Sequence, residues 1–209
     1  VLFLPLFSFN DSIYVAFPLK GFTLQWYADM LENPALLQAL ENSVKVGAAV
    51  AIASTFLGIF AAKAMTRYRL PGKGPLTSFI MLPLVVPGII LGIALLVISN
   101  TVGVDLSLYT IALAHTLVAV PFAMLVLMSR LEGFDKSLEE ASLDLGESAF
   151  QTFLRVTLPL AWPGILASVL LTFTISFDEF ILAFFLAGNE VTLPIYIWSQ
   201  LRFPNRLPM

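Results

Sequence analysis

Four long apolar segments constrain this chain more than any other feature of its sequence. They cover residues 44–65, 76–98, 108–128 and 160–186. Each has about the 20 apolar residues that an α-helix needs to cross the hydrocarbon core of a bilayer. The chain is 58% hydrophobic and only 12% charged, whereas about 25% of the residues of a soluble domain are charged. The sequence therefore predicts an all-α integral membrane protein built as a multi-span helical bundle.

The first two apolar segments contain residues that shape a membrane helix. Small side chains recur at helical spacing in the first segment, at Gly47, Ala51, Thr55, Gly58 and Ala62. Such a stripe lets helices approach closely in lipid, and we expect it to serve packing rather than to line a pore. Pro83 and Pro87 in the second segment predict a bent helix. That helix either lines a translocation path or carries a static kink.

The third and fourth segments contain ionisable residues, which are costly in a membrane and often functional. His115 lies in the third segment, and Phe177-Asp178-Glu179 lies deep in the fourth. Neighbours on a helix point about 100° apart, so at least one acid should face a cavity or another helix. Asp178 or Glu179 either offers negative charge to a cationic substrate or holds helices together. His115 either forms a structural hydrogen bond or lies on the substrate path.

A polar interval at residues 137–159 separates the third and fourth segments. Ser137 and Glu140 have the spacing of a capping box, so a helix should begin at Ser137. Gly146 can adopt the left-handed conformation that ends such a helix. A second short helix should follow until Pro159 stops or kinks the chain.

The first of these two short helices has a narrow apolar face. Leu138, Ala141 and Leu145 fall at i, i+3 and i+7, which places them on one side of a helix. A short exposed helix with a small apolar face at a membrane surface is typical of a docking element.

The same interval resembles the EAA motif of ABC importer permeases. The matching residues are Glu140-Ala141-Ser142, Gly146 and, after nine intervening residues, Val156-Thr157-Leu158-Pro159. The family pattern has Ala in place of Ser142 and Ile in place of Val156. The resemblance implies that residues 137–145 form a cytoplasmic coupling helix, which seats in a groove of a separate ATPase subunit. It assigns this coupling to Glu140, Ala141, Ser142, Leu145, Gly146, Leu158 and Pro159.

Nearly the whole chain is similar to the spermidine/putrescine permease family. The residues that carry the similarity are Phe9-Asn10-Asp11, Phe22-Thr23, Trp26-Tyr27, Arg67-Tyr68-Arg69, residues 130–135 and Phe177-Asp178-Glu179. The resemblance implies the second permease subunit of a type I importer for polyamines or a similar small solute. Its implied partners are an ABC ATPase dimer, another permease subunit, an extracytoplasmic solute-binding protein and the lipid bilayer of a bacterial inner membrane.

Comparison with that family also suggests how the chain is divided. Residues 1–42 should be the end of a first membrane helix plus an extracytoplasmic loop. Residues 43–209 should be the transmembrane domain, with the coupling segment inside it. Relative to the family, the start of the first helix and the sixth helix are missing, so we expect a chain truncated at both ends.

Basic residues are concentrated in two of the loops. Four lie between Lys63 and Lys73, and Arg130, Lys136 and Arg155 lie in or beside the polar interval. Because positively charged loops stay in the cytoplasm, both loops should face it. This argument does not depend on the motif and agrees with it.

Several functions are disfavoured by what the sequence lacks. It has no cysteine and one histidine, so we expect no metal site, and it has no basic aromatic surface for nucleic acid. No G-x-x-x-x-G-K-[ST] loop occurs. We therefore expect no enzyme activity and no cofactor, with ATP bound by a partner subunit. The alternative is an ion-gradient-driven secondary transporter or channel subunit, which would need no docking helix.

Overall fold

The computed structural model describes residues 3–12 and 17–202 of the chain. Within these ranges the regular structure is helical, apart from an isolated antiparallel bridge between Asn10 and Phe22. The prediction of an all-α fold is confirmed.

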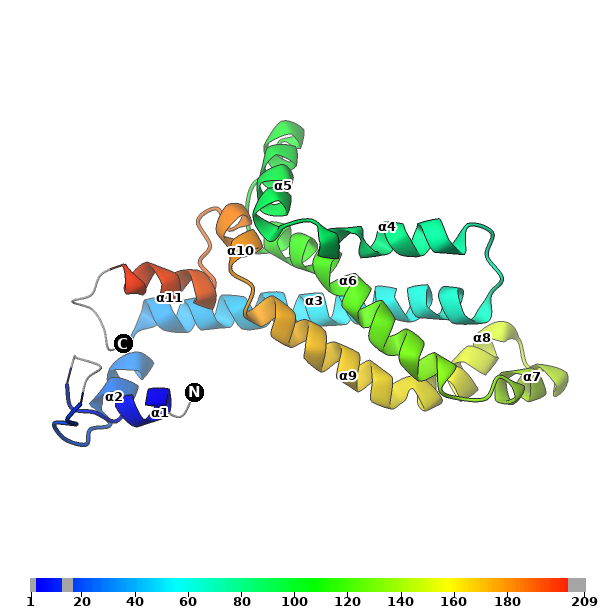
Figure 1. The fold of residues 1–209 in the computed structure, drawn as a ribbon, viewed down its shortest axis with the longest axis horizontal. Helices are drawn as coiled ribbons and strands as arrows, with labels where there is room; N and C mark the ends of the chain where they lie inside the picture. The colour runs from blue at the N-terminus through cyan, green and yellow to red at the C-terminus, as the bar shows by residue number, and fades with distance from the viewer. Residues whose placement is uncertain (1–2, 13–16, 203–209) are drawn as a thin grey trace.

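Three helices in the described part of the chain are long and apolar enough to cross a membrane. They are α3 (Pro34–Arg67), α6 (Leu108–Glu132) and a continuous helix over Ala149–Phe177. The last consists of α8 (Ala149–Thr152), a π-helical turn η1 (Phe153–Thr157) and α9 (Leu158–Phe177). α6 and α9 cross α3 obliquely and pack against it (Figure 1).

Helix α3 begins at Pro34, well before the predicted start at residue 44. Asn33 caps it, since its Oδ1 accepts hydrogen bonds from Ala35 N and Leu36 N, each at 3.1 Å. Pro34 suits the first helical position because its missing N–H would have no partner there. The polar residues before the apolar run are therefore helical rather than part of a loop.

The predicted span over residues 76–98 is two helices. α4 (Lys73–Val85) and α5 (Gly88–Val102) meet at 99°, so the pair is either a broken span or a re-entrant loop. Val86 is extended, with ψ of 127°, because the ring of Pro87 excludes the helical conformation at the preceding residue. The prolines of this segment predicted a bent helix but not the angle of the bend.

The predicted span over residues 160–186 is also displaced. The helix starts at Ala149 and ends at Phe177, and α10 (Ile181–Leu186) is a separate element. Of the two predicted effects of Pro159, a stop or a kink, the stop does not occur, because the helix continues through it. It lies in the first turn of α9, directly after the π-helical turn η1, a widened turn of the kind that accommodates a disturbed hydrogen-bond ladder.

The small-residue stripe of α3 packs against α6 and α9, as predicted. All five of its residues are buried. A Cβ added to Gly58 would lie 2.7 Å from Ala123 Cβ, so only glycine permits this approach of α3 and α6. Thr55 Oγ1 and Ser168 Oγ form a buried hydrogen bond of 3.0 Å between α3 and α9.

The two ends of α3 carry different neighbours (Figure 1). Beside Arg67 lie α7 (Ser137–Asp144) and α8. Near Pro34 lie the short helices α1 (Phe3–Phe7), α2 (Gln25–Leu31) and α11 (Leu193–Leu201). We call these the Arg67 end and the Pro34 end of the molecule.

Candidate functional site: the coupling segment and the break after α9

Helix α7 begins at Ser137 as predicted, but another residue caps it. Asp135 Oδ1 accepts a hydrogen bond of 3.0 Å from Ser137 N, and that bond lowers the pKa of the Asp135 carboxyl. Ser137 itself forms no capping bond, so the predicted capping box of Ser137 and Glu140 is wrong. Ser137 is already the first helical residue, and its hydroxyl is past the capping position.

Gly146 ends α7 in the predicted manner. Its φ is +92°, a conformation that glycine adopts without steric cost. Glu147 N donates to Ser142 O at 3.2 Å and Gly146 N donates to Leu143 O at 3.0 Å. These two bonds are the Schellman pattern, which closes the last turn of a helix.

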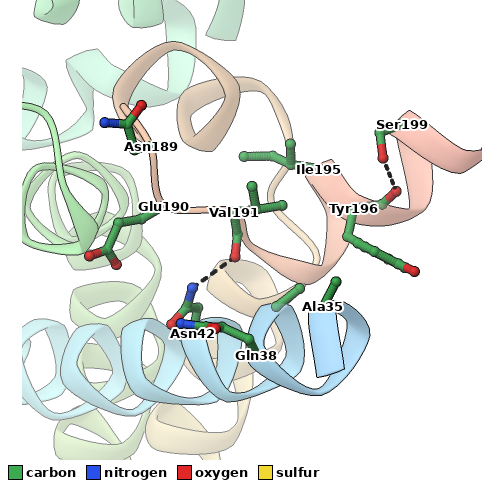
Figure 2. Close-up of a pocket in the computed structure, with 10 residues that line it drawn as sticks. Ala35, Gln38, Asn42, Asn189, Glu190, Val191, Ile195, Tyr196 and Ser199 are labelled. Carbon is green, nitrogen blue, oxygen red and sulfur yellow. Dashed lines mark hydrogen bonds between the residues drawn. The ribbon is translucent and has the colours of Figure 1, made fainter. Parts of the chain in front are cut away.

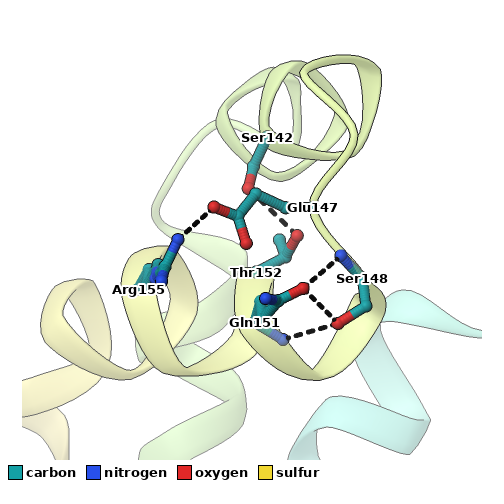
Figure 3. Close-up of polar contacts among 6 residues, drawn as sticks. All are labelled: Ser142, Glu147, Ser148, Gln151, Thr152 and Arg155. Carbon is teal, nitrogen blue, oxygen red and sulfur yellow. Dashed lines mark hydrogen bonds and ion pairs between the residues drawn. The ribbon is translucent and has the colours of Figure 1, made fainter.

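A capping box does exist, at the start of α8 (Figure 3). Gln151 N donates to Ser148 Oγ at 3.3 Å, and Ser148 N donates to Gln151 Oε1 at 2.9 Å. The sequence spacing S-x-x-Q at residues 148–151 was available as a signal, and it marks the second short helix.

Side-chain contacts hold α7 against α8 and η1 (Figure 3). Ser142 Oγ and Thr152 Oγ1 form a buried hydrogen bond of 3.0 Å. Arg155 pairs with Glu147 at the turn between α7 and α8. The EAA pattern has alanine at the position of Ser142. Serine is suited to this position because its hydroxyl pairs with the buried hydroxyl of Thr152.

A buried ion pair joins α7 to the end of the membrane helix α3. Arg67 Nε lies 2.7 Å from Glu139 Oε2, and the two side chains are only 7% and 14% exposed. Thr157 of η1 donates its hydroxyl hydrogen to the same carboxylate. The Arg67 guanidinium also lies over the ring of Phe134, 4.6 Å from its centroid. Three elements therefore meet at Glu139.

Sequence reasoning missed this ion pair. It used Arg67 for orientation and for the family resemblance, and it gave Glu139 no role. The two residues are far apart in the chain, and no spacing rule connects them. The available signal was weak: an acid in the first turn of a helix that lies beside a basic loop.

The surface of the coupling segment remains largely uncovered by the chain. Five large apolar side chains are exposed there: Leu138, Leu143, Leu145, Phe150 and Leu154. Of the predicted coupling residues, Glu140 and Ala141 are exposed, and Leu145 is 87% exposed. Ser142 is buried, and Leu158 packs inward against an apolar cluster that includes Met65 and Leu127.

Asp178 and Glu179 lie at a break in the chain rather than inside a helix. Asp178 is the C-cap of α9. The Glu179 carboxylate caps α10 by accepting hydrogen bonds from the backbone N–H groups of Ile181, Leu182 and Ala183, at 3.0, 2.9 and 3.2 Å. The predicted position deep in a continuous helix is therefore wrong, because this local capping replaces the helical ladder.

His115 and Glu179 are brought together by the fold. His115 Nδ1 lies 2.8 Å from Ser176 Oγ in a hydrogen bond. His115 Nε2 lies 3.1 Å from Glu179 Oε2, and the two side chains are 2% and 21% exposed. The Nε2 contact lacks the alignment of a hydrogen bond. The histidine thus has the helix-to-helix hydrogen bond that its isolation suggested, and also a carboxylate neighbour.

Asp178 has a different environment from Glu179. It is exposed, and its carboxylate has no hydrogen bond or ion pair within residues 3–12 and 17–202. Phe177 stacks on Phe173 with ring centroids 5.6 Å apart. Asp178 is therefore the acid of the pair whose carboxylate is not used by the described residues. No group of acids, histidines or cysteines suited to a metal ion occurs in the part of the chain that was described.

Comparisons with known proteins agree on one family. Residues 54–204 match the family described as binding-protein-dependent transport system inner membrane component. The chain is 34% identical to the spermidine/putrescine transport system permease protein PotC of Escherichia coli (strain K12), over 93% of this chain and 74% of that protein. It is also 34% identical to the putrescine transport system permease protein PotI of the same strain, over 97% and 74%.

A relative named for a different substrate also matches. The probable molybdenum ABC transporter permease protein HVO_B0370 of Haloferax volcanii is 35% identical over 79% of this chain and 65% of its own length.

Two solved structures share the fold. A bacterial ABC transporter for the acidic polysaccharide alginate gives a TM-score of 0.69 at 16% identity, over 90% of this chain and 65% of that chain. An amino acid ABC transporter with histidines gives 0.63 at 16% identity, over 88% and 86%. The family match covers more than half of the chain and the relatives exceed 30% identity. The chain therefore belongs to the family of binding-protein-dependent transport system inner membrane components.

Proposed function

We propose that this chain is a membrane permease subunit of an ATP-driven ABC importer for polyamines or a similar small amine. The observation that carries the proposal is the 34% identity to PotC and PotI over more than nine tenths of the chain. Those two proteins are described as permeases for spermidine and putrescine. The chain would lie in a bacterial inner membrane, with the Arg67 end in the cytoplasm.

The exposed apolar surface of the coupling segment supports an ATPase partner. Leu145 is 87% exposed and Phe150 is 69% exposed at a polar surface, which marks a docking site in a soluble environment. We assign that surface to an ABC ATPase dimer, which would bind the ATP, so this chain needs no cofactor. A second permease subunit and an extracytoplasmic solute-binding protein would complete the importer.

The ion pair of Arg67 and Glu139 explains how motion of α7 would reach the membrane. A docking helix transmits force only if it moves with the span behind it. Glu139 joins α7 to α3 through Arg67 and to the base of α9 through Thr157. Closure of the ATPase dimer would therefore shift α3 and α9 together, as alternating access requires.

Asp178 is our candidate for contact with the substrate. Its carboxylate is exposed, whereas that of Glu179 is occupied by the N-terminus of α10. A carboxylate next to a membrane path favours a cation, so a polyamine suits it better than the oxyanion that a molybdenum carrier would take. Glu179 and His115 would hold α9 and α10 in place on either side of the break rather than bind the solute.

The test is uptake by a reconstituted transporter. The chain would be co-expressed with the second permease subunit, ATPase and binding protein that the proposal requires, and uptake of radiolabelled putrescine and spermidine would be measured in proteoliposomes. We expect uptake that requires ATP, the binding protein and an intact α7. Uptake driven by an ion gradient without ATP would instead establish the secondary-transporter alternative. Uptake of molybdate but not of amines would support the ATP-driven importer and refute the assignment of an amine substrate.

A further inference from the structure

A hollow of about 220 Å³ lies at the Arg67 end, between the last turns of α3 and the coupling segment. Three of the residues that line it are cationic, namely Lys63, Arg67 and Lys136. Two are carboxylates, Glu139 and Glu140. Three cationic and two anionic side chains leave one net positive charge, and we call this site the basic hollow.

The larger pocket at the Pro34 end has a different lining. It lies between α3, residues 189–191 and α11, with a volume of about 480 Å³ (Figure 2). Glu190 is the one ionised residue among the described residues that line it. Figure 2 shows the Glu190 carboxylate directed away from Ala35, Ile195 and Tyr196. An excess of charge on the wall therefore distinguishes the basic hollow from this pocket.

The cations of the basic hollow are only partly satisfied by the chain. Within residues 3–12 and 17–202, neither lysine forms an ion pair. The Lys63 ammonium lies 4.5 Å from the centroid of the Phe153 ring, a contact that stabilises a cation without neutralising it. Arg67 Nη2 is buried and has no hydrogen-bond acceptor among the described residues. The basic hollow therefore keeps positive charge and unused donor groups.

The two carboxylates do not supply the missing partner. Glu139 attracts Lys63 electrostatically, but its oxygens already take up the Arg67 guanidinium and the Thr157 hydroxyl. Glu140 is exposed and forms no ion pair in the described part of the chain. An external anion would thus meet a site that its own acids leave positive.

An exposed apolar stripe on α3 leads to the basic hollow. Ile52, Phe56 and Phe60 recur every four residues and are exposed, so they lie along one side of the helix. At about 100° per residue, Lys63 falls on the same side. The Phe153 ring stacks on Phe60 at 6.3 Å and also faces Lys63. This side of α3, which we call the Ile52 stripe, is therefore continuous with the basic hollow.

The basic hollow lies at the depth of the phosphate layer of a bilayer. The apolar run of α3 starts at Val44, and Lys63 follows 19 residues later, a rise of about 29 Å along a helix. The hydrocarbon core of a bilayer is about 30 Å thick. When this run spans the core, Lys63 and Arg67 reach the boundary between acyl chains and headgroups.

We propose that the basic hollow and the Ile52 stripe bind one anionic phospholipid of the cytoplasmic leaflet. Its phosphodiester carries the single negative charge that the hollow lacks and accepts charged hydrogen bonds from Lys63 and Lys136. One acyl chain lies along the Ile52 stripe. Because Lys63 is on α3 and Lys136 precedes α7, the lipid bridges the same two elements that Arg67 and Glu139 join. The inference goes beyond the proposed function and does not depend on the solute.

The test is binding of phosphatidylglycerol to the delipidated transporter, purified in detergent with its partner subunits and followed by native mass spectrometry. Lys63→Gln removes a half-buried charge and should raise the Kd about tenfold, the loss of one charged hydrogen bond. Lys136→Gln removes an exposed charge and should raise it about threefold. Lys63→Arg keeps the charge and should retain binding. Phosphatidylcholine, whose headgroup has no net charge, should bind weakly to every form.

Lys73→Gln is the matched control. It removes one exposed cationic charge at the start of α4, outside the lining of the basic hollow. It should leave the Kd unchanged, which separates a local site from general attraction to a basic loop. Glycerol phosphate should not displace the lipid, because it has no acyl chain for the Ile52 stripe. Thermal unfolding of each variant checks that the fold is retained.

Four outcomes would overturn the proposal. An unchanged Kd in both Lys63→Gln and Lys136→Gln removes the site, and equal weakening by Lys73→Gln reduces it to a diffuse field. Displacement of the lipid by glycerol phosphate assigns the hollow to a free phosphate compound. Weaker docking of the ATPase to Lys63→Gln, with unchanged lipid binding, assigns it to that partner. The measurement needs neither ATP nor solute, so a failure of ATP-driven amine uptake leaves its result unaffected.

Discussion

Glu139 and Asp178 are both acids next to a membrane helix, and the chain treats them in opposite ways. Glu139 is 14% exposed, forms an ion pair with Arg67 and accepts a hydrogen bond from Thr157. Asp178 is exposed, and none of the described residues bonds to its carboxylate. The first acid has its partners within the chain, and the carboxylate of the second has none among the described residues.

The difference separates a carboxylate that fixes neighbouring elements from a carboxylate that is exposed to its surroundings. A buried carboxylate needs a cation and hydrogen bonds, and once it has them it fixes the elements that supply them. At the Arg67 end, the Glu139 carboxylate therefore links α3, α7 and η1. An unpaired carboxylate next to a break keeps its charge available for a ligand.

Removing the cation of the closed site should have the largest effect. Arg67→Ala leaves the Glu139 carboxylate buried without its partner, and loss of one member of a buried pair costs about 3 kcal/mol or more. Thermal and denaturant unfolding in detergent would measure the loss. Arg69→Ala, two residues further along and exposed, should change little. Arg67→Met with Glu139→Gln should recover part of the stability, and no recovery would contradict pairing between them.

Neutralising the two acids at the break should separate stability from substrate binding. Glu179→Gln loses the charge that caps α10 and should cost roughly 1–2 kcal/mol. Asp178→Asn should leave the unfolding free energy nearly unchanged and raise the KM for amine uptake. Unfolding and uptake would be measured on both variants. Equal effects of the two substitutions on both quantities would show that the acids do not differ in role.

The hydroxyl pair under α7 gives a smaller test of the closed site. Ser142→Ala restores the alanine of the EAA pattern but leaves the buried Thr152 hydroxyl without its partner. We expect a loss of about 1 kcal/mol. Ser142→Ala combined with Thr152→Val should be milder than the sum of the two single changes. Strict additivity in unfolding measurements would indicate that the hydroxyls do not interact.

The smallest effect should come from the cap of α7. The hydrogen bond from Ser137 N holds the pKa of Asp135 below its ordinary value of 3.8. A lowered pKa stabilises the cap above that value and loses the contribution as the pH falls through the lowered pKa. Amide exchange at Ser137 should thus stay protected from pH 7 to pH 5 and lose protection only below 3.8. Asp135→Asn should remove this pH dependence, and an unaltered profile would count against the cap.

Local sequence signals determined the elements whose cause is local. Three of the four apolar runs lie in helices long enough to cross a membrane, because a helix satisfies its own backbone hydrogen bonds within lipid, whereas the run at residues 76–98 forms a bent pair of helices. Gly146 ended α7 because the positive φ there suits glycine, and the small stripe of α3 packed as its spacing indicated.

Sequence patterns failed where two local rules competed. Ser137 and Ser148 both have capping-box spacing, and only Ser148 forms the box because Asp135 caps the first helix. Pro159 reads as a stop but falls in a first turn, where proline is tolerated. Proline at residue 87 predicted a bend, but only the structure gives its angle of 99°.

The sequence by itself therefore determined the class of protein, the docking motif and the residues of interest, because these follow from hydropathy and from short spacings. Only the tertiary structure decided which polar residues meet. His115 and Glu179, Arg67 and Glu139, and Lys63 and Lys136 are each distant in the chain. Their partners are chosen by how α3, α6 and α9 cross, and a crossing is a property of packed surfaces that no single segment encodes.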